Sequence, residues 1–189
     1  MALFPGFFSF IACFAILSTL WHRHVQFFRR YGLYDTATVA LNTVLLALVL
    51  FYLYPLKFLM NSVCEVLEYA VMRTIIGPHP KPQAFSNAGL VPRIMSVYMI
   101  GFGAVSLAFA LLYRHALRRR ADLKLSPFEE AVTLDDFALW TVATLCTLIA
   151  AAWTRWAPHD IAPLGSFFLF AIPLIRKLQK RRRAARAQN

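Results

Sequence analysis

Long runs of apolar residues with almost no charged side chains constrain the fold of this chain more than any other feature. A helix needs about 20 mostly apolar residues to cross the hydrocarbon core of a bilayer. Such runs occupy residues 3–21, 37–60, 94–113 and 137–153, and a shorter fifth run at 161–175 contains two prolines. We therefore predict an all-α, multispan transmembrane bundle with five membrane-spanning helices in residues 1–175, followed by a basic tail at 176–189.

Composition supports this class. Hydrophobic residues make up 59% of the chain and charged residues 15%, whereas soluble domains carry roughly 45–50% and about 25%. The distribution of Lys and Arg sets the orientation, because these residues are enriched on the cytoplasmic side. The segments 22–34, 114–131 and 176–189 carry fifteen of them, against three in 61–91 and 154–160. The sequence thus predicts a cell-membrane protein with a cytoplasmic C-terminus.

Two segments next to the spans have helical signals of their own. Apolar residues recur at helical spacing after Met60, which predicts either an extension of the second span or an interfacial helix. The sequence GPHPKP, at 77–82, then ends that helix, because prolines lack an amide donor. Ser126, Pro127 and Glu129 have the spacing of a helix N-terminus with a capping box, just before the fourth span.

Enzyme, metal and cofactor roles find no support in the sequence. No catalytic motif is present, and none of the nine acidic residues lies in the middle of a span, where transporters and enzymes of the membrane usually keep an ionisable group. His22 and His24 point apart on one helix, and His115 and His159 lie at span ends on opposite sides of the membrane, so we predict no metal or haem site. The three cysteines are best explained as buried small hydrophobic residues.

Clusters of basic residues flank the spans. The tail could bind nucleic acid, but no aromatic residues alternate with its charges as a single-strand binding groove requires. The simpler interpretation is a lipid-facing basic anchor beside anionic headgroups. The predicted anchor residues are Arg118, Arg119, Arg120, Arg181, Arg182 and Arg183. We therefore predict the lipid bilayer, and no nucleic acid, as a partner.

A polar seam is predicted where the first two spans approach each other. Its residues are Trp21, His24, Phe28, Asp35 and Asn42. The first three are spaced three and four apart, hence on one face. The acid stands where the second helix begins, and Asn42 lies seven residues further on, two turns along the same face. An aromatic belt and a helix cap alone would explain Trp21 and Asp35. They do not explain Asn42, whose amide is costly in the apolar layer unless it bonds to a neighbouring helix.

The same positions carry a family resemblance. The sequence contains the pattern W-x-x-H-x-x-x-F at Trp21, His24 and Phe28. An Asp follows seven residues after the Phe, at Asp35, and the pair L-N ends seven residues after the Asp, at Leu41–Asn42. This pattern resembles the second and third helices of the transmembrane protein 175 family of potassium channels, in its bacterial branch. The likeness runs from about residue 7 to residue 125.

This resemblance implies more than the residues show. Family members have six helices and form tetramers. Their first helix lines the pore and selects ions by a hydrophobic constriction. That helix begins with an Arg and a Phe-Ser-Asp motif and packs against the seam. We find no match to that helix here. Two readings follow: an N-terminally truncated, homo-oligomeric channel with potassium as its permeant ion, or a non-conducting membrane subunit that assembles with a full-length relative. A structural, lipid-interacting bundle is a third possibility.

Overall fold

The structure, a computed structural model, describes residues 3–77 and 90–156 of the 189-residue chain. These residues form four long helices, α1 (Leu3–Tyr31), α2 (Thr36–Ile75), α4 (Leu90–Arg118) and α5 (Pro127–Trp156), and no strand. The predicted all-α class is thereby confirmed. The predicted fifth span and the basic tail lie outside the described residues.

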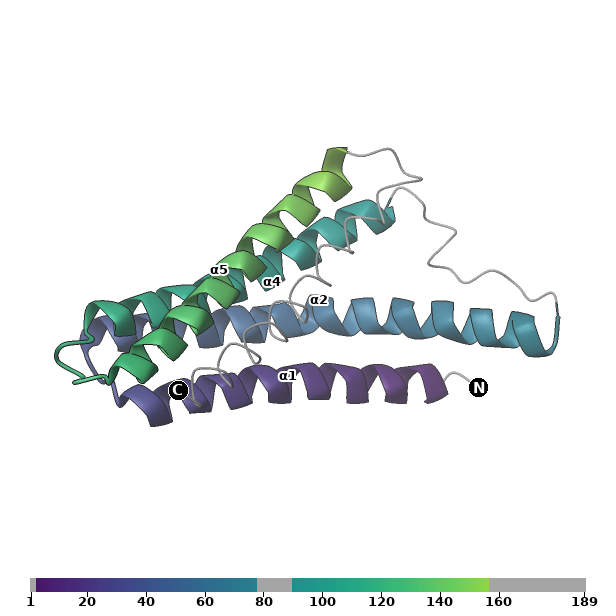
Figure 1. Cartoon of the computed structure of the whole chain (residues 1–189). Coiled ribbons are helices and arrows are strands. Elements are labelled where there is room, and N and C mark those ends of the chain that lie inside the picture. The colour runs from purple at the N-terminus through teal and green to yellow at the C-terminus, as the bar shows by residue number, and fades with distance from the viewer. Residues whose placement is uncertain (1–2, 78–89, 157–189) are drawn as a thin grey trace.

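All four helices are long and apolar enough to cross a membrane. They run alternately in opposite directions, so the α1–α2 and α4–α5 turns lie at the same end of the bundle (Figure 1). We call this the turn end. At 1.5 Å per residue the 40-residue α2 is roughly 60 Å long, and it extends well beyond the other helices at the opposite end (Figure 1).

The helices α1 and α2 end later than the apolar runs predict, and a glycine with a positive φ follows each of them. α1 continues ten residues past Trp21 and ends before Gly32, whose φ of +54° suits a residue without a side chain. α2 continues without a break through the segment after Met60, so the extension is the correct one of the two alternatives. It ends before Gly77, which has a φ of +103°.

The helix start predicted before the fourth span is confirmed. The Ser126 amide donates to a Glu129 carboxylate oxygen at 2.9 Å, and the Glu129 amide donates to the Ser126 hydroxyl at 3.3 Å. These reciprocal bonds are the two halves of a capping box. Pro127 is the first residue of α5, where its missing N–H costs nothing.

The core lies where all four helices meet, toward the turn end. Phe27 of α1, Leu45 of α2, Phe109 and Tyr113 of α4, and Trp140 of α5 are buried together. The rings of Phe109 and Trp140 are stacked 4.4 Å apart. α4 and α5 pack most extensively. In α1 and α2, only 17% and 18% of the most apolar 18-residue stretch is buried, against 56% in α4. The helices α1 and α2 therefore leave most of their surface for lipid or for another helix.

Candidate functional site: a polar seam at the turn end

His24 and Asn42 meet across α1 and α2. Nε2 of His24 lies 2.6 Å from Oδ1 of Asn42. An amide oxygen only accepts, so the imidazole carries its proton on Nε2 and donates it, which leaves Nδ1 of a neutral ring as an acceptor. Nδ1 is buried, and within the part of the chain that the structure describes no group donates to it. This leaves His24 with one bond made and one acceptor unsatisfied.

Two aromatic side chains enclose the His24 ring. Trp21 stacks on it with ring centroids 5.2 Å apart, and Phe28 lies on the other side at 4.9 Å. All three project from one face of α1, as their spacing predicts. Trp21 nevertheless remains 59% exposed, so its outer face is free to contact lipid or a further helix.

A groove of about 640 Å³ adjoins this cluster between α1 and α2. Its walls are mainly apolar, and they include Phe14 and Leu17 of α1 and Leu46 and Val49 of α2. Trp21 and His24 stand in the lining as well. The groove therefore combines apolar walls with the buried, unsatisfied Nδ1 of the His24 ring.

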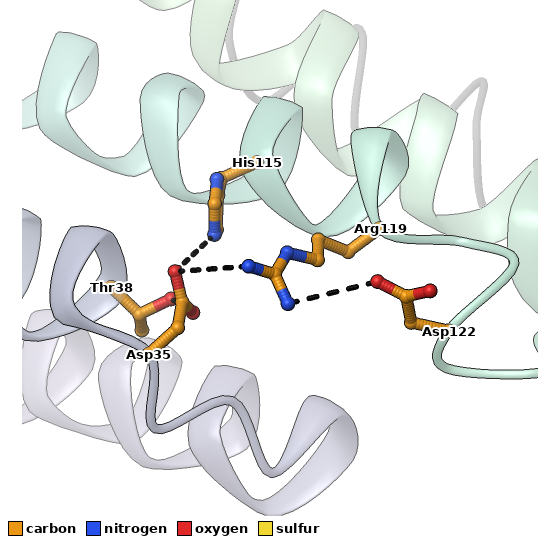
Figure 2. A network of polar contacts seen from close by, with 5 residues as sticks. All are labelled: Asp35, Thr38, His115, Arg119 and Asp122. Atoms are coloured by element: carbon orange, nitrogen blue, oxygen red, sulfur yellow. Dashed lines mark hydrogen bonds and ion pairs between the residues drawn. The ribbon is translucent and has the colours of Figure 1, made fainter.

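Asp35 faces a different helix from Asn42. It is the N-cap residue of α2, with an extended ψ of 158°, so its side chain leaves the helical face on which the sequence placed it. Oδ1 accepts a hydrogen bond from the Thr38 hydroxyl at 2.6 Å, and Oδ2 lies 2.9 Å from Nε2 of His115 on α4. Figure 2 shows the carboxylate between the His115 ring and the Arg119 guanidinium, 3.9 Å away.

The surroundings of Asp35 favour its charged form. Its pKa lies below the ordinary value, first because the Thr38 hydroxyl donates to the carboxylate, and then because of the hydrogen bond and charge of His115 and the charge of Arg119. Arg119 also reaches Asp122 at 3.6 Å. The network thus ties the start of α2 to the end of α4.

A second polar contact joins α1 to α5 at the same end. The hydroxyl groups of Tyr31 and Thr133 are 2.8 Å apart and buried. Nearby, Arg30 lies 3.9 Å from the carboxylate of Asp136. These contacts join α1 to α5 and the Asp35 network joins α2 to α4, so the His24–Asn42 contact between α1 and α2 completes the connection of all four helices.

Sequence reasoning missed these partners. Thr38 could have been found, because a hydroxyl three residues after an N-cap acid is a local signal. His115 is 80 positions from Asp35, and Thr133 is 102 from Tyr31. No local spacing connects such residues before the crossing of the helices is known.

The described residues of the predicted basic anchor differ in whether they pair with an acid. Arg119 pairs with Asp35 and Asp122, and Arg120 pairs with Glu130 of α5. Arg118 is exposed and has no carboxylate partner in residues 3–77 and 90–156. The remaining anchor residues, Arg181, Arg182 and Arg183, lie outside the described part of the chain. Of the described anchor residues, only Arg118 is thus left free for lipid.

The four helices and the polar network at their common end define a multi-pass membrane protein. The sequence profile of the family described as "Endosomal/lysosomal potassium channel TMEM175" matches residues 1–52. A protein named "Potassium channel" from Marivirga tractuosa is 34% identical over 166 residues, covering 85% of this chain and 66% of the relative, just under two thirds of its length. The chain belongs to the TMEM175 family.

A solved structure agrees with this assignment. The potassium channel MtTMEM175, crystallised as a variant in complex with a nanobody-MBP fusion protein, superposes with a TM-score of 0.79 at 26% sequence identity. The match covers 97% of this chain and 80% of that chain. The likeness therefore extends over the whole helical bundle and beyond the residues matched by the family profile.

Proposed function

We propose that this chain forms the helical body of a potassium channel, in which the polar seam and the adjoining groove hold a pore-lining helix. The relative and the solved structure that it resembles are both named potassium channels. In this proposal the seam residues position the pore helix and do not touch the ion. The ion would pass along the seated helix, whose apolar constriction would select it.

The observation that carries the proposal is the groove with its unsatisfied histidine. The apolar groove of about 640 Å³ between α1 and α2 offers the kind of surface against which a further helix packs. The buried Nδ1 of His24 has no donor, and leaving it so costs free energy. A seated helix that brought a hydroxyl or guanidinium group would supply the missing donor. The Arg and Ser of the family motif have this chemistry.

The same proposal includes orientation and assembly. Arg29 and Arg30 in the last turn of α1, Arg118 in the last turn of α4 and Arg120 two residues after it belong to the turn end, which supports placing that end in the cytoplasm. With five spans the C-terminus lies there too, in a bacterial inner membrane. The weakly buried surfaces of α1 and α2 support a homo-oligomer, a tetramer by family resemblance, around the pore.

Potassium flux into liposomes tests the proposal. The 189-residue chain is compared with a version extended at its N-terminus by the in-frame codons found upstream in the DNA. In the extended version, Ser18→Trp fills the groove, since Ser18 lines it. Thr19→Trp is the matched control, because Thr19 is also exposed, donates its hydroxyl hydrogen bond within its own helix to Ala15 and does not line the groove.

We expect flux from the extended version, its loss with Ser18→Trp and its retention with Thr19→Trp. Flux in neither version would remove the channel function and favour the structural bundle. If the DNA has a stop codon just before Met1 and the chain conducts only when a full-length relative is co-reconstituted, the non-conducting subunit is the correct reading.

A further inference from the structure

The outer face of α4 changes from apolar to basic along its length. Ile100, Leu107 and Arg114 are spaced seven apart and therefore lie along one side of the helix, and Arg118 follows one turn later. Ile100 is 55% exposed and Leu107 is 47% exposed, and both arginines are exposed too. This face thus has apolar surface at membrane depth and two guanidinium groups at the turn end.

These two arginines differ from Arg119 and Arg120 in having no acid beside them in the described part of the chain. Arg119 lies 3.9 Å from Asp35, and Arg120 is paired with Glu130. Neither Arg114 nor Arg118 has a carboxylate partner among residues 3–77 and 90–156. Like charges four residues apart on a helix repel each other. An anion shared between them would remove that repulsion.

We propose that this face of α4 binds an anionic phospholipid, with its phosphate held between Arg114 and Arg118. Guanidinium groups bind phosphate oxygens with paired hydrogen bonds. Leu107 lies about 10 Å from Arg114 along the helix axis, which is within the roughly 15 Å of one hydrocarbon leaflet. An acyl chain can therefore lie along Leu107 while its headgroup contacts both arginines. Only a lipid, and not a soluble phosphate, uses both parts of this face.

Native mass spectrometry of the purified chain tests the proposal by counting retained phospholipids. The protein is saturated with phosphatidylglycerol or with phosphatidylcholine, in separate arms, and then diluted. The test variant is Arg114→Gln with Arg118→Gln. The control is Arg29→Gln with Lys124→Gln, which removes the same charge at the same end from exposed side chains that do not lie on this face.

We expect the wild type and the control to retain phosphatidylglycerol equally, and the test variant to retain it on the order of tenfold less. Phosphatidylcholine should be lost from all three. Equal retention in wild type and test variant overturns the proposal. Equal loss from control and test variant also overturns it, because lipid would then follow total charge. So does retention of phosphatidylcholine, or displacement of the lipid by inorganic phosphate.

A second variant guards against misfolding. Arg114→Lys with Arg118→Lys keeps both charges and removes the paired hydrogen bonds. We expect its phosphatidylglycerol retention to fall between those of the wild type and the glutamine variant. If the glutamine variant is not monodisperse, retention by the lysine variant equal to that of the wild type overturns the proposal.

Discussion

Nε2 of His24 and Oδ1 of Asn42 lie 2.6 Å apart, although the two residues are separated by 18 positions and belong to different helices. This hydrogen bond joins α1 to α2 at the edge of the groove. Interhelical hydrogen bonds in membrane proteins contribute about 0.6 kcal/mol on average, and up to about 1.7 kcal/mol. Both halves of the contact come from the polar seam predicted from sequence. Its role in seating a pore helix remains a proposal.

Replacing Asn42 by leucine should weaken the α1–α2 contact without preventing membrane insertion. The variant leaves Nε2 of His24 without its acceptor, so we expect a loss of roughly 0.5–1.5 kcal/mol, seen as a lower melting temperature in detergent. Thr43→Val is the control, because the Thr43 hydroxyl donates within its own helix, to the Val39 carbonyl. Equal melting temperatures for the two variants would show that the His24 contact contributes nothing.

The Asp35 network should make stability depend on pH in the acid range. The pKa of Asp35 is lowered in the folded protein. Its contribution is therefore fully present above the unfolded value of about 3.9 and is lost as the pH falls through the folded pKa. We expect the melting-temperature difference between wild type and Asp35→Asn to shrink as the pH falls below about 4.

The control for the pH experiment is Asp122→Asn. Asp122 is 69% exposed and, within residues 3–77 and 90–156, pairs only with Arg119, and exposed ion pairs contribute little. We expect its melting temperature to follow the wild type at every pH. A wild-type to Asp35→Asn difference that is constant with pH would contradict the role of the Asp35 charge.

The close packing of α4 against α5 should not tolerate a methyl group at Gly103. A Cβ atom there would lie 2.8 Å from the Thr147 hydroxyl oxygen, and Thr147 is fully buried and already bonds to its own helix. Overpacking of this kind costs about 1–3 kcal/mol, more than the gain of about 1 kcal/mol from replacing a helical glycine. Gly103→Ala should therefore lower the melting temperature in detergent.

Gly6→Ala is the opposite test within the same chain. No atom lies within 4 Å of a Cβ at Gly6, so the variant keeps the gain in helix propensity and meets no clash. We expect its melting temperature to rise slightly. A rise for both alanine variants would mean that α4 and α5 are further apart than the structure places them.

Tyr98 should protect one backbone amide of α2. Its hydroxyl oxygen accepts a hydrogen bond from the Leu59 amide at 2.5 Å, which joins α4 to α2. In Tyr98→Phe we expect faster hydrogen exchange in the peptide that contains Leu59, and unchanged exchange in the peptide around Thr43. Unchanged exchange at Leu59 would contradict the contact.

Features set by local sequence were predictable. Uninterrupted apolar runs predicted the helices, and the spacing of Ser126 and Glu129 predicted a capping box that the structure contains. Helix ends were less predictable, because Trp21 marks the end of the apolar run and not the end of α1. Asp35 was placed on the face of Asn42, but its extended backbone turns the carboxylate to His115. That contact depends on how α2 and α4 cross, which the spacing of residues cannot supply.

The most direct test of the proposed channel is potassium flux through liposomes that contain the N-terminally extended version, with Ser18→Trp and Thr19→Trp beside it. Occupation of the groove by a pore helix predicts flux that Ser18→Trp abolishes and Thr19→Trp preserves. Flux that survives Ser18→Trp unchanged would contradict the role of the groove. Absence of flux from the extended version itself would contradict the potassium-channel function.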